Sequence, residues 1–222
     1  MSPDDAEMTP FARSDDGAVL VEVTVMLAIM LVLVLGSIDF LFAFYQWNAA
    51  AKAVAVGARI AAVSDPVASG LRNLSLAVVG PDRLPGAPMP AFTVVCDGAQ
   101  ATCTCTSGTC PDVGAYDAAA MGTIVFGRGS SACDDARSFY YAGMCDVFSR
   151  ITPANVVITY TQTGLGFAGR PGGPVPTITV SLQNLSFRFF FLDGLARFRN
   201  IPIPPLTTSI TAEDLSSRAP DF

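Results

Sequence analysis

The sequence predicts an α+β protein: a long N-terminal transmembrane helix that continues outside the membrane, followed by a small disulfide-stapled domain with an antiparallel sheet. Three observations predict this fold. An apolar run occupies residues 18–38, all six cysteines follow it, and the last third of the chain alternates apolar and polar residues as strands do. We expect a polar leader over 1–17, the membrane helix and its extension over 18–64, and an extracytoplasmic α+β domain over 65–222.

The run over 18–38 is the predicted membrane span. As a helix it would be about 31 Å long at roughly 1.5 Å per residue, which just crosses a hydrocarbon core. No charged residue lies between Val23 and Ile38. Tyr and Trp favour the headgroup level, so the aromatic cluster after the run marks its exit from the membrane. The cluster consists of Phe40, Phe42, Phe44, Tyr45 and Trp47.

The helix is expected to continue past the membrane. Residues 48–63 contain no proline and are rich in alanine, and Asp65 before Pro66 ends the helix because a residue that precedes proline disfavours the α region. One face of this extension carries mostly small residues, which lets another helix approach closely. These residues are Ala50, Val54, Gly57 and Ala61. An equally open interpretation is that Gly57 relieves crowding inside its own domain.

The remaining residues predict short elements of both kinds. A short helix is expected over 67–78, and further helices over 116–125 and 136–149. The cysteine-rich stretch 96–111 is expected to be a loop. Strands are predicted over 92–96, 155–163, 175–182, 187–192 and 206–211.

The six cysteines predict disulfides in an oxidising compartment, because their number is even and all lie on one side of the span. They are Cys96, Cys103, Cys105, Cys110, Cys133 and Cys145. Zinc is the rival interpretation, but one residue separates Cys103 from Cys105 and the chain has no histidine. Six cysteines allow about 15 pairings, and the sequence does not choose among them.

Charge and composition argue against several functions. The net charge is −6 and the scattered Lys and Arg form no basic stripe, so we expect no nucleic-acid partner. Without histidine there is no ordinary general base near neutral pH, and no phosphate-binding or dinucleotide motif occurs. We therefore expect no enzyme, no cofactor and no metal. A tethered disulfide-rich enzyme would need convergent titratable groups within 92–212.

Glu22 stands just inside the apolar run, where a carboxylate is costly and needs a reason. A cut after Gly17 would leave Ala18 as the new N-terminus and Glu22 as the fifth residue. A short polar leader, Gly at the cut and Glu within the hydrophobic helix resemble the layout of type IV prepilins. The open alternative is an interfacial carboxylate that the dipole favours at a helix N-terminus.

The segment 17–63 reads GAVLVEVTVMLAIMLVLVLGSIDFLFAFYQWNAAAKAVAVGARIAAV. Four features occur in order along it: Gly17 with Glu22, a span rich in Leu and Val, the acidic–aromatic pair Asp39-Phe40, and Gly57-Ala58-Arg59 in the Ala-rich helix. With these features the segment resembles the TadE-like family of the tight-adherence (Flp) pilus system. The residues after 64 carry only a general likeness, an extracytoplasmic domain that ends in β structure.

The resemblance implies a non-catalytic minor pseudopilin-like protein that serves pilus assembly, anchored by a single pass in the bacterial inner membrane. Prepilin peptidase would cut between Gly17 and Ala18. The other partners would be membrane lipid, pilin-like subunits and the pilus assembly machinery. By analogy with pilins, Glu22 would pair with the free amine at Ala18 of a neighbouring subunit, and each charge would offset part of the other's desolvation. The subunit-contact residues would be Glu22, Asp39, Gly57 and Arg59.

Two alternatives accompany this interpretation. In the first, Asp39 is simply a polar residue at the membrane exit and makes no specific partner contact. In the second, the whole chain is a membrane-tethered extracytoplasmic binding module without a pilus role. Two signals disagree about the orientation of the chain in the membrane. The leader is acidic while Lys52 and Arg59 lie beyond the span, so the positive-inside rule points the other way. We place the C-terminal domain on the periplasmic side because the cysteines follow the span.

Overall fold

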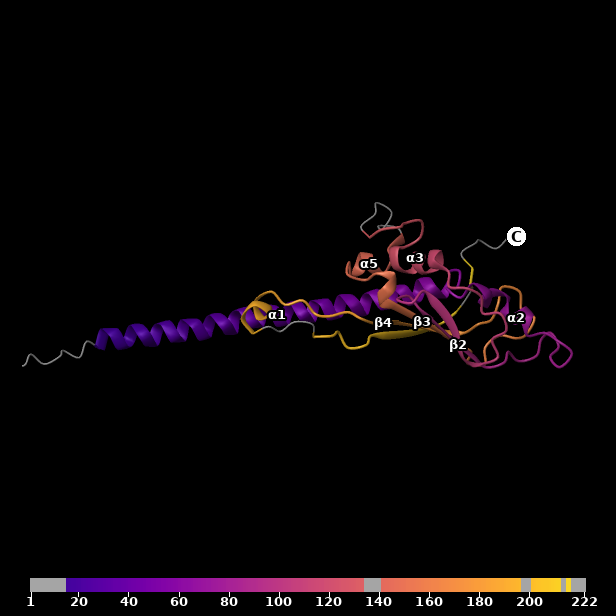
Figure 1. Cartoon of the computed structure of the whole chain (residues 1–222), viewed down its shortest axis with the longest axis horizontal. Helices are drawn as coiled ribbons and strands as arrows, with labels where there is room; N and C mark the ends of the chain where they lie inside the picture. The colour runs from indigo at the N-terminus through magenta and orange to yellow at the C-terminus, as the bar shows by residue number, and fades with distance from the viewer. Residues whose placement is uncertain (1–14, 134–140, 197–200, 213–214, 217–222) are drawn as a thin grey trace, which may run out of the picture. The chain divides into compact units, whose positions relative to one another are not determined.

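The computed structural model describes residues 15–133, 141–196, 201–212 and 215–216 (Figure 1). The chain divides into two compact units. Unit 1 comprises the described residues of Met1–Phe42 and Phe189–Arg199, and unit 2 those of Ala43–Arg188 and Asn200–Phe222. The division falls inside the first helix, between Phe42 and Ala43, whereas the boundary expected from the sequence follows residue 64.

Helix α1 spans Asp15–Ala62 and ends one turn before Pro66, as the sequence predicts. In unit 1 its large apolar side chains are exposed from Val19 to Val34. Exposed Val, Leu, Ile and Met in such number are what a lipid-facing helix carries, and water-facing helices do not. Unit 1 also contains the short helix α6, Phe191–Ala196.

The sheet of unit 2 has five antiparallel strands in the order β2-β1-β3-β4-β5. The strands are β1 (Phe92–Asp97), β2 (Thr102–Gly108), β3 (Val156–Thr161), β4 (Thr177–Leu182) and β5 (Thr207–Thr211). Strands β3 and β4 form the predicted hairpin, in full register from Val156↔Leu182 to Thr161↔Thr177. The predicted α+β class with an antiparallel sheet is therefore confirmed.

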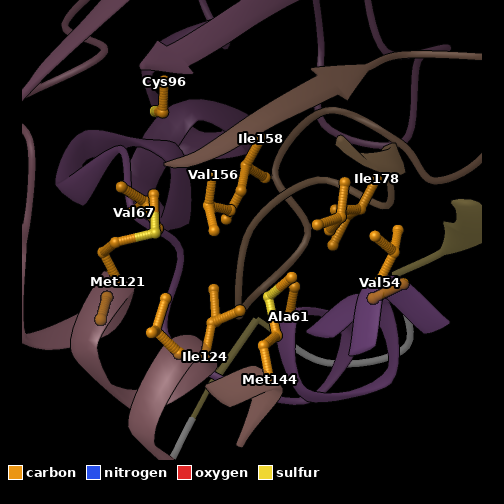
Figure 2. Close-up of a cluster of buried hydrophobic side chains, with 14 of the residues drawn as sticks. Val54, Ala61, Val67, Cys96, Met121, Ile124, Met144, Val156, Ile158 and Ile178 are labelled. Atoms are coloured by element: carbon orange, nitrogen blue, oxygen red, sulfur yellow. The ribbon is translucent and has the colours of Figure 1, made fainter. Parts of the chain in front are cut away.

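One face of the sheet forms the core. Burial alternates strictly along β1, β3 and β4, because successive side chains point to opposite faces of a strand. The buried residues pack against the alanine-rich end of α1 and against two short helices, α3 (Ala118–Phe126) and α5 (Met144–Val147). Figure 2 shows Val54 and Ala61 of α1 in this cluster with Ile178 of β4.

Several shorter elements agree with the sequence. The expected helix over 67–78 is a 3₁₀ turn, Ser69–Asn73, followed by α2, Leu74–Ala77. Helix α3 begins at Ala118, two residues later than expected, because the carboxylate of Asp117 caps it by accepting the amides of Ala119 and Ala120. Of the helix expected over 136–149, residues 136–140 lie outside the described residues, and α5 covers 144–147. A second 3₁₀ turn, Pro153–Asn155, precedes β3.

Two predictions of local structure were wrong. The stretch 96–111, expected to be a loop, contains β2, which pairs with β1 because a cross-strand disulfide holds Cys96 opposite Cys103. The strand expected over 187–192 does not form, and α6 begins at Phe191 instead. A segment rich in phenylalanine predicted a strand there, but tertiary contacts with α1 override that local preference.

Candidate membrane anchor and assembly region

The residues of the predicted processing point lie on the exposed surface of α1. Gly17, Ala18 and Glu22 are all helical and exposed. Glu22 is surrounded in sequence by exposed apolar residues, and the next acidic residue along the helix is Asp39. Of the residues that the structure describes, only α1, over Gly17–Ala62, forms a helix long and apolar enough to cross a membrane.

Asp39 is fully buried, although it lies at the end of the apolar span. Its Oδ1 accepts the backbone N–H of Phe190 at 2.9 Å, and its Oδ2 accepts that of Phe191 at 2.9 Å. These are amides at the start of α6, which have no carbonyl partner within so short a helix. In addition, the Phe42 and Phe190 rings lie 4.9 Å apart. Asp39 thus holds α6 on α1 within unit 1.

Gln46 plays a comparable part in unit 2. Its side-chain amide exchanges two hydrogen bonds with the backbone of Arg188, donating to the carbonyl at 2.9 Å and accepting from the N–H at 3.1 Å. The guanidinium of Arg150 donates to Gln46 Oε1 and to the carbonyl of Ser186. Partial burial, together with the nearby charge of Arg188, lowers the pKa of Arg150 from its ordinary value. This cluster fixes the chain that leads towards α6.

Gly57 is buried within unit 2. A Cβ built at this position would lie 2.4 Å from Sδ and 2.7 Å from Cγ of Met144, a side chain with no exposed surface. Gly57 therefore lets α5 approach α1 inside one subunit. This geometry favours the intradomain interpretation of the small-residue face, and its other members, Ala50, Val54 and Ala61, are also in the core.

Arg59 differs from Gly57 because its side chain is exposed. It lies in the last turn of α1, where a cation interacts favourably with the helix dipole. Lys52, two turns earlier, is exposed as well. Of the expected subunit-contact residues, Gly57 and Arg59 lie within residues 43–62, and Arg59 is the one whose side chain is accessible.

The cysteines form three disulfides, which resolves the pairing that the sequence left open. The bonded pairs are Cys96–Cys103, Cys105–Cys110 and Cys133–Cys145. Each closes a short loop, with sequence separations of 7, 5 and 12 residues. Two pairs contain a buried cysteine, whereas in Cys105–Cys110 the first cysteine is exposed and the second is partly buried.

A shallow hollow of about 300 Å³ opens on unit 2 between Ile60, Val63, Arg128, Tyr141 and Ala142. Arg128 donates to the carbonyl of Val63 across it, at 2.8 Å. Within the described residues, no group of three His, Cys, Asp or Glu side chains is placed to hold a metal ion.

The residues that α1 holds in place were not predicted from the sequence as functional residues; they are Phe190, Phe191 and the Arg150 cluster. A signal for the first two was present, since three consecutive phenylalanines at 189–191 lie between Arg188 and Arg197. An apolar run flanked by arginines is a pattern of membrane-interface segments as well as of strands. The pairing of distant residues such as Gln46 and Arg188 left no local signal.

Together these features define the class: an α+β protein with one long apolar N-terminal helix, which suggests a single-pass membrane anchor. Residues 17–59 match the model of the family described as TadE-like protein, so the resemblance drawn from the sequence is confirmed over that segment. The match and the apolar helix fit a membrane protein associated with the Tad pilus. Neither the comparison with curated proteins nor that with solved structures found a match.

Proposed function

We propose that this protein is a non-catalytic, minor pseudopilin-like component of tight-adherence pilus assembly, anchored by α1 in the bacterial inner membrane with unit 2 on the periplasmic side. The observation that carries the proposal is the TadE-like match over residues 17–59, which begins at the residue where the cut is expected. The disulfides support the periplasmic placement, because such bonds persist in oxidising compartments.

The mechanism rests on one charge pair. Prepilin peptidase cuts after Gly17 and creates a free amine at Ala18. The amine of one subunit then meets Glu22 of its neighbour within the bilayer. Each charge alone has a large desolvation cost, and pairing offsets part of it. Glu22 supports this role because it is exposed on α1 and therefore available to a neighbouring subunit.

The contact set is narrower than the sequence alone implies. Glu22 and Arg59 remain our proposed subunit-contact residues, because both are exposed. Asp39 and Gly57 make intramolecular contacts that account for their burial. We therefore propose that these two act in assembly only indirectly, by holding α6 and α5 in place.

The test is the N-terminal residue of the mature protein, measured by mass spectrometry after expression in a host that contains prepilin peptidase. We expect Ala18. An intact Met1 would contradict the proposal, and so would a start at any residue beyond Glu22. With processing established, Glu22→Leu should abolish pilus assembly while Glu22→Asp retains part of it. Assembly that tolerates Glu22→Leu would favour the tethered binding module.

A further inference from the structure

Unit 1 carries a second apolar surface next to the span. It consists of Phe40, Leu41, Phe190 and Phe191, which we call the aromatic collar. Their exposed fractions are 71%, 66%, 65% and 43%. Four large apolar side chains with exposed fractions this high are unusual on a protein that faces only water, and such exposure marks a contact with another phase or another molecule.

The backbone beneath the collar is prepared for a medium without water. The amides of Phe190 and Phe191 would need solvent if they had no other acceptor, because they precede or begin a short helix. Both oxygens of the buried Asp39 accept them instead. Backbone groups that reach the hydrocarbon region must be satisfied within the protein, and these two amides meet that condition.

Continuity with the span identifies the medium as lipid. The exposed apolar surface of α1 runs from Val19 to Leu41 with Glu22 near its start and the buried Asp39 near its end. A helix from 18 to 38 uses about 31 Å of hydrocarbon thickness, so Phe40 and Leu41 come at the level where acyl chains meet headgroups. In the sequence, Arg188 precedes the collar and Arg197 follows it, and arginines at such positions favour lipid phosphates.

We propose that the segment 189–196, locked to α1 by Asp39, is a second membrane contact of this chain, which places the Phe190 and Phe191 rings in the headgroup–acyl boundary of the bilayer. The contact adds apolar area at the exit of the span, and it restrains rotation of α1 about its axis. It requires α1 to lie in a bilayer but does not require processing at Gly17 or pilus assembly.

The test uses fluorescence of the full chain reconstituted in phosphatidylcholine–phosphatidylglycerol vesicles. Trp47→Phe removes the one native tryptophan, and Phe191→Trp then places a reporter in the collar. Acyl chains brominated near the headgroup quench tryptophan on contact. An interfacial ring lies about 5–10 Å inside the boundary, so we expect about half of the emission to be lost with this label. Bromine near the bilayer centre should quench it less.

Two matched controls bracket the result. Phe167→Trp, at a position exposed to 45% in unit 2, should keep its emission with either label. Leu27→Trp, at a position exposed to 64% in the span, should be quenched most by the deep label. The proposal would be overturned if brominated lipid quenched Leu27→Trp but left the emission of Phe191→Trp unchanged, as it should leave that of Phe167→Trp. Shielding of Phe191→Trp from both brominated lipid and aqueous acrylamide would also overturn it, because the collar would then be covered by protein.

Asp39 supplies an independent check. Asp39→Leu removes both acceptors of the α6 amides, so quenching of the Phe191→Trp reporter by shallow bromine should fall towards the Phe167→Trp level. Leu27→Trp should be unaffected by the same substitution, which separates loss of the collar from loss of membrane insertion. Undiminished quenching in Asp39→Leu would refute the locking role assigned to the carboxylate.

Discussion

Replacing Gly57 with alanine tests whether the small-residue face of α1 serves the fold of unit 2. The new Cβ would lie 2.4 Å from Sδ of Met144, whose side chain is fully buried and can move only by displacing its neighbours. Overpacking of this kind costs about 1–3 kcal/mol. Alanine recovers about 1 kcal/mol over glycine in a helix interior. The net expectation is a loss of stability of about 0–2 kcal/mol.

The sign should reverse when Met144 is shortened. Met144→Ala alone should cost about 2–5 kcal/mol, because it leaves a cavity in the core. The substitution removes the three atoms nearest to the Gly57 Cβ, which are Sδ, Cγ and Cε of Met144. In the Met144→Ala background, Gly57→Ala should therefore stabilise by about 1 kcal/mol, since only the helix-propensity gain remains.

The assay is urea unfolding of the full chain in detergent micelles under non-reducing conditions, followed by the fluorescence of Trp47, which packs against the core. Gly122→Ala in α3 is the control, because its Cβ would meet nothing closer than 3.7 Å. It should stabilise by about 0.5–1 kcal/mol. If Gly57→Ala destabilises equally in both backgrounds, the contact with Met144 is not the reason for glycine. Unchanged stability with failed pilus assembly would restore the intersubunit role.

Three further predictions concern unit 2. The Tyr160 hydroxyl accepts the buried N–H of Val67 at 3.0 Å, so Tyr160→Phe should cost about 1–3 kcal/mol in urea unfolding; an unchanged midpoint would contradict this bond. Burial raises the pKa of Tyr160 above its ordinary value of 10.0, so the folded state keeps a proton that the unfolded state loses. Stability should thus fall as pH rises past that value, less steeply in Tyr160→Phe. Under mild reduction, Cys105–Cys110 should open first because Cys105 is exposed, whereas each other pair contains a buried cysteine. Alkylation of Cys96, Cys103, Cys133 or Cys145 before this pair would refute that order.

Patterns of local physics made much of the fold predictable from sequence. Continuous apolarity over 18–38 and the Asp65-Pro66 break defined α1, and the alternation within 155–163 and 175–182 defined the central hairpin. Predictions failed where a partner outside the segment decides its structure. Strand β2 depends on pairing with β1, and 187–192 is not a strand because Asp39 captures its backbone amides.

The candidate site divides in the same way. Glu22 and Gly17 were found because a carboxylate in an apolar run is anomalous on its own, whatever the tertiary structure. For Asp39 and Gly57 the residue type indicated an important position, but the sequence did not indicate which residue each one contacts. The Asp39 carboxylate binds the amide of Phe190, which is 151 residues away in the chain. The backbone of Gly57 faces Met144, which is 87 residues away.

The sequence by itself determined the membrane helix, its end near Pro66, the presence of a stapled antiparallel domain and the carboxylate near the start of the span. Each follows from the hydrophobicity, conformational preference or redox chemistry of residues close together in the chain. Only the tertiary structure decided which cysteines pair, that the alanine face of α1 is buried within one subunit, and that Asp39 holds α6. The contacts of Asp39 and Gly57 join residues far apart in sequence. The cysteine pairs are close in sequence, but several pairings are open until the fold brings particular cysteines within bonding distance.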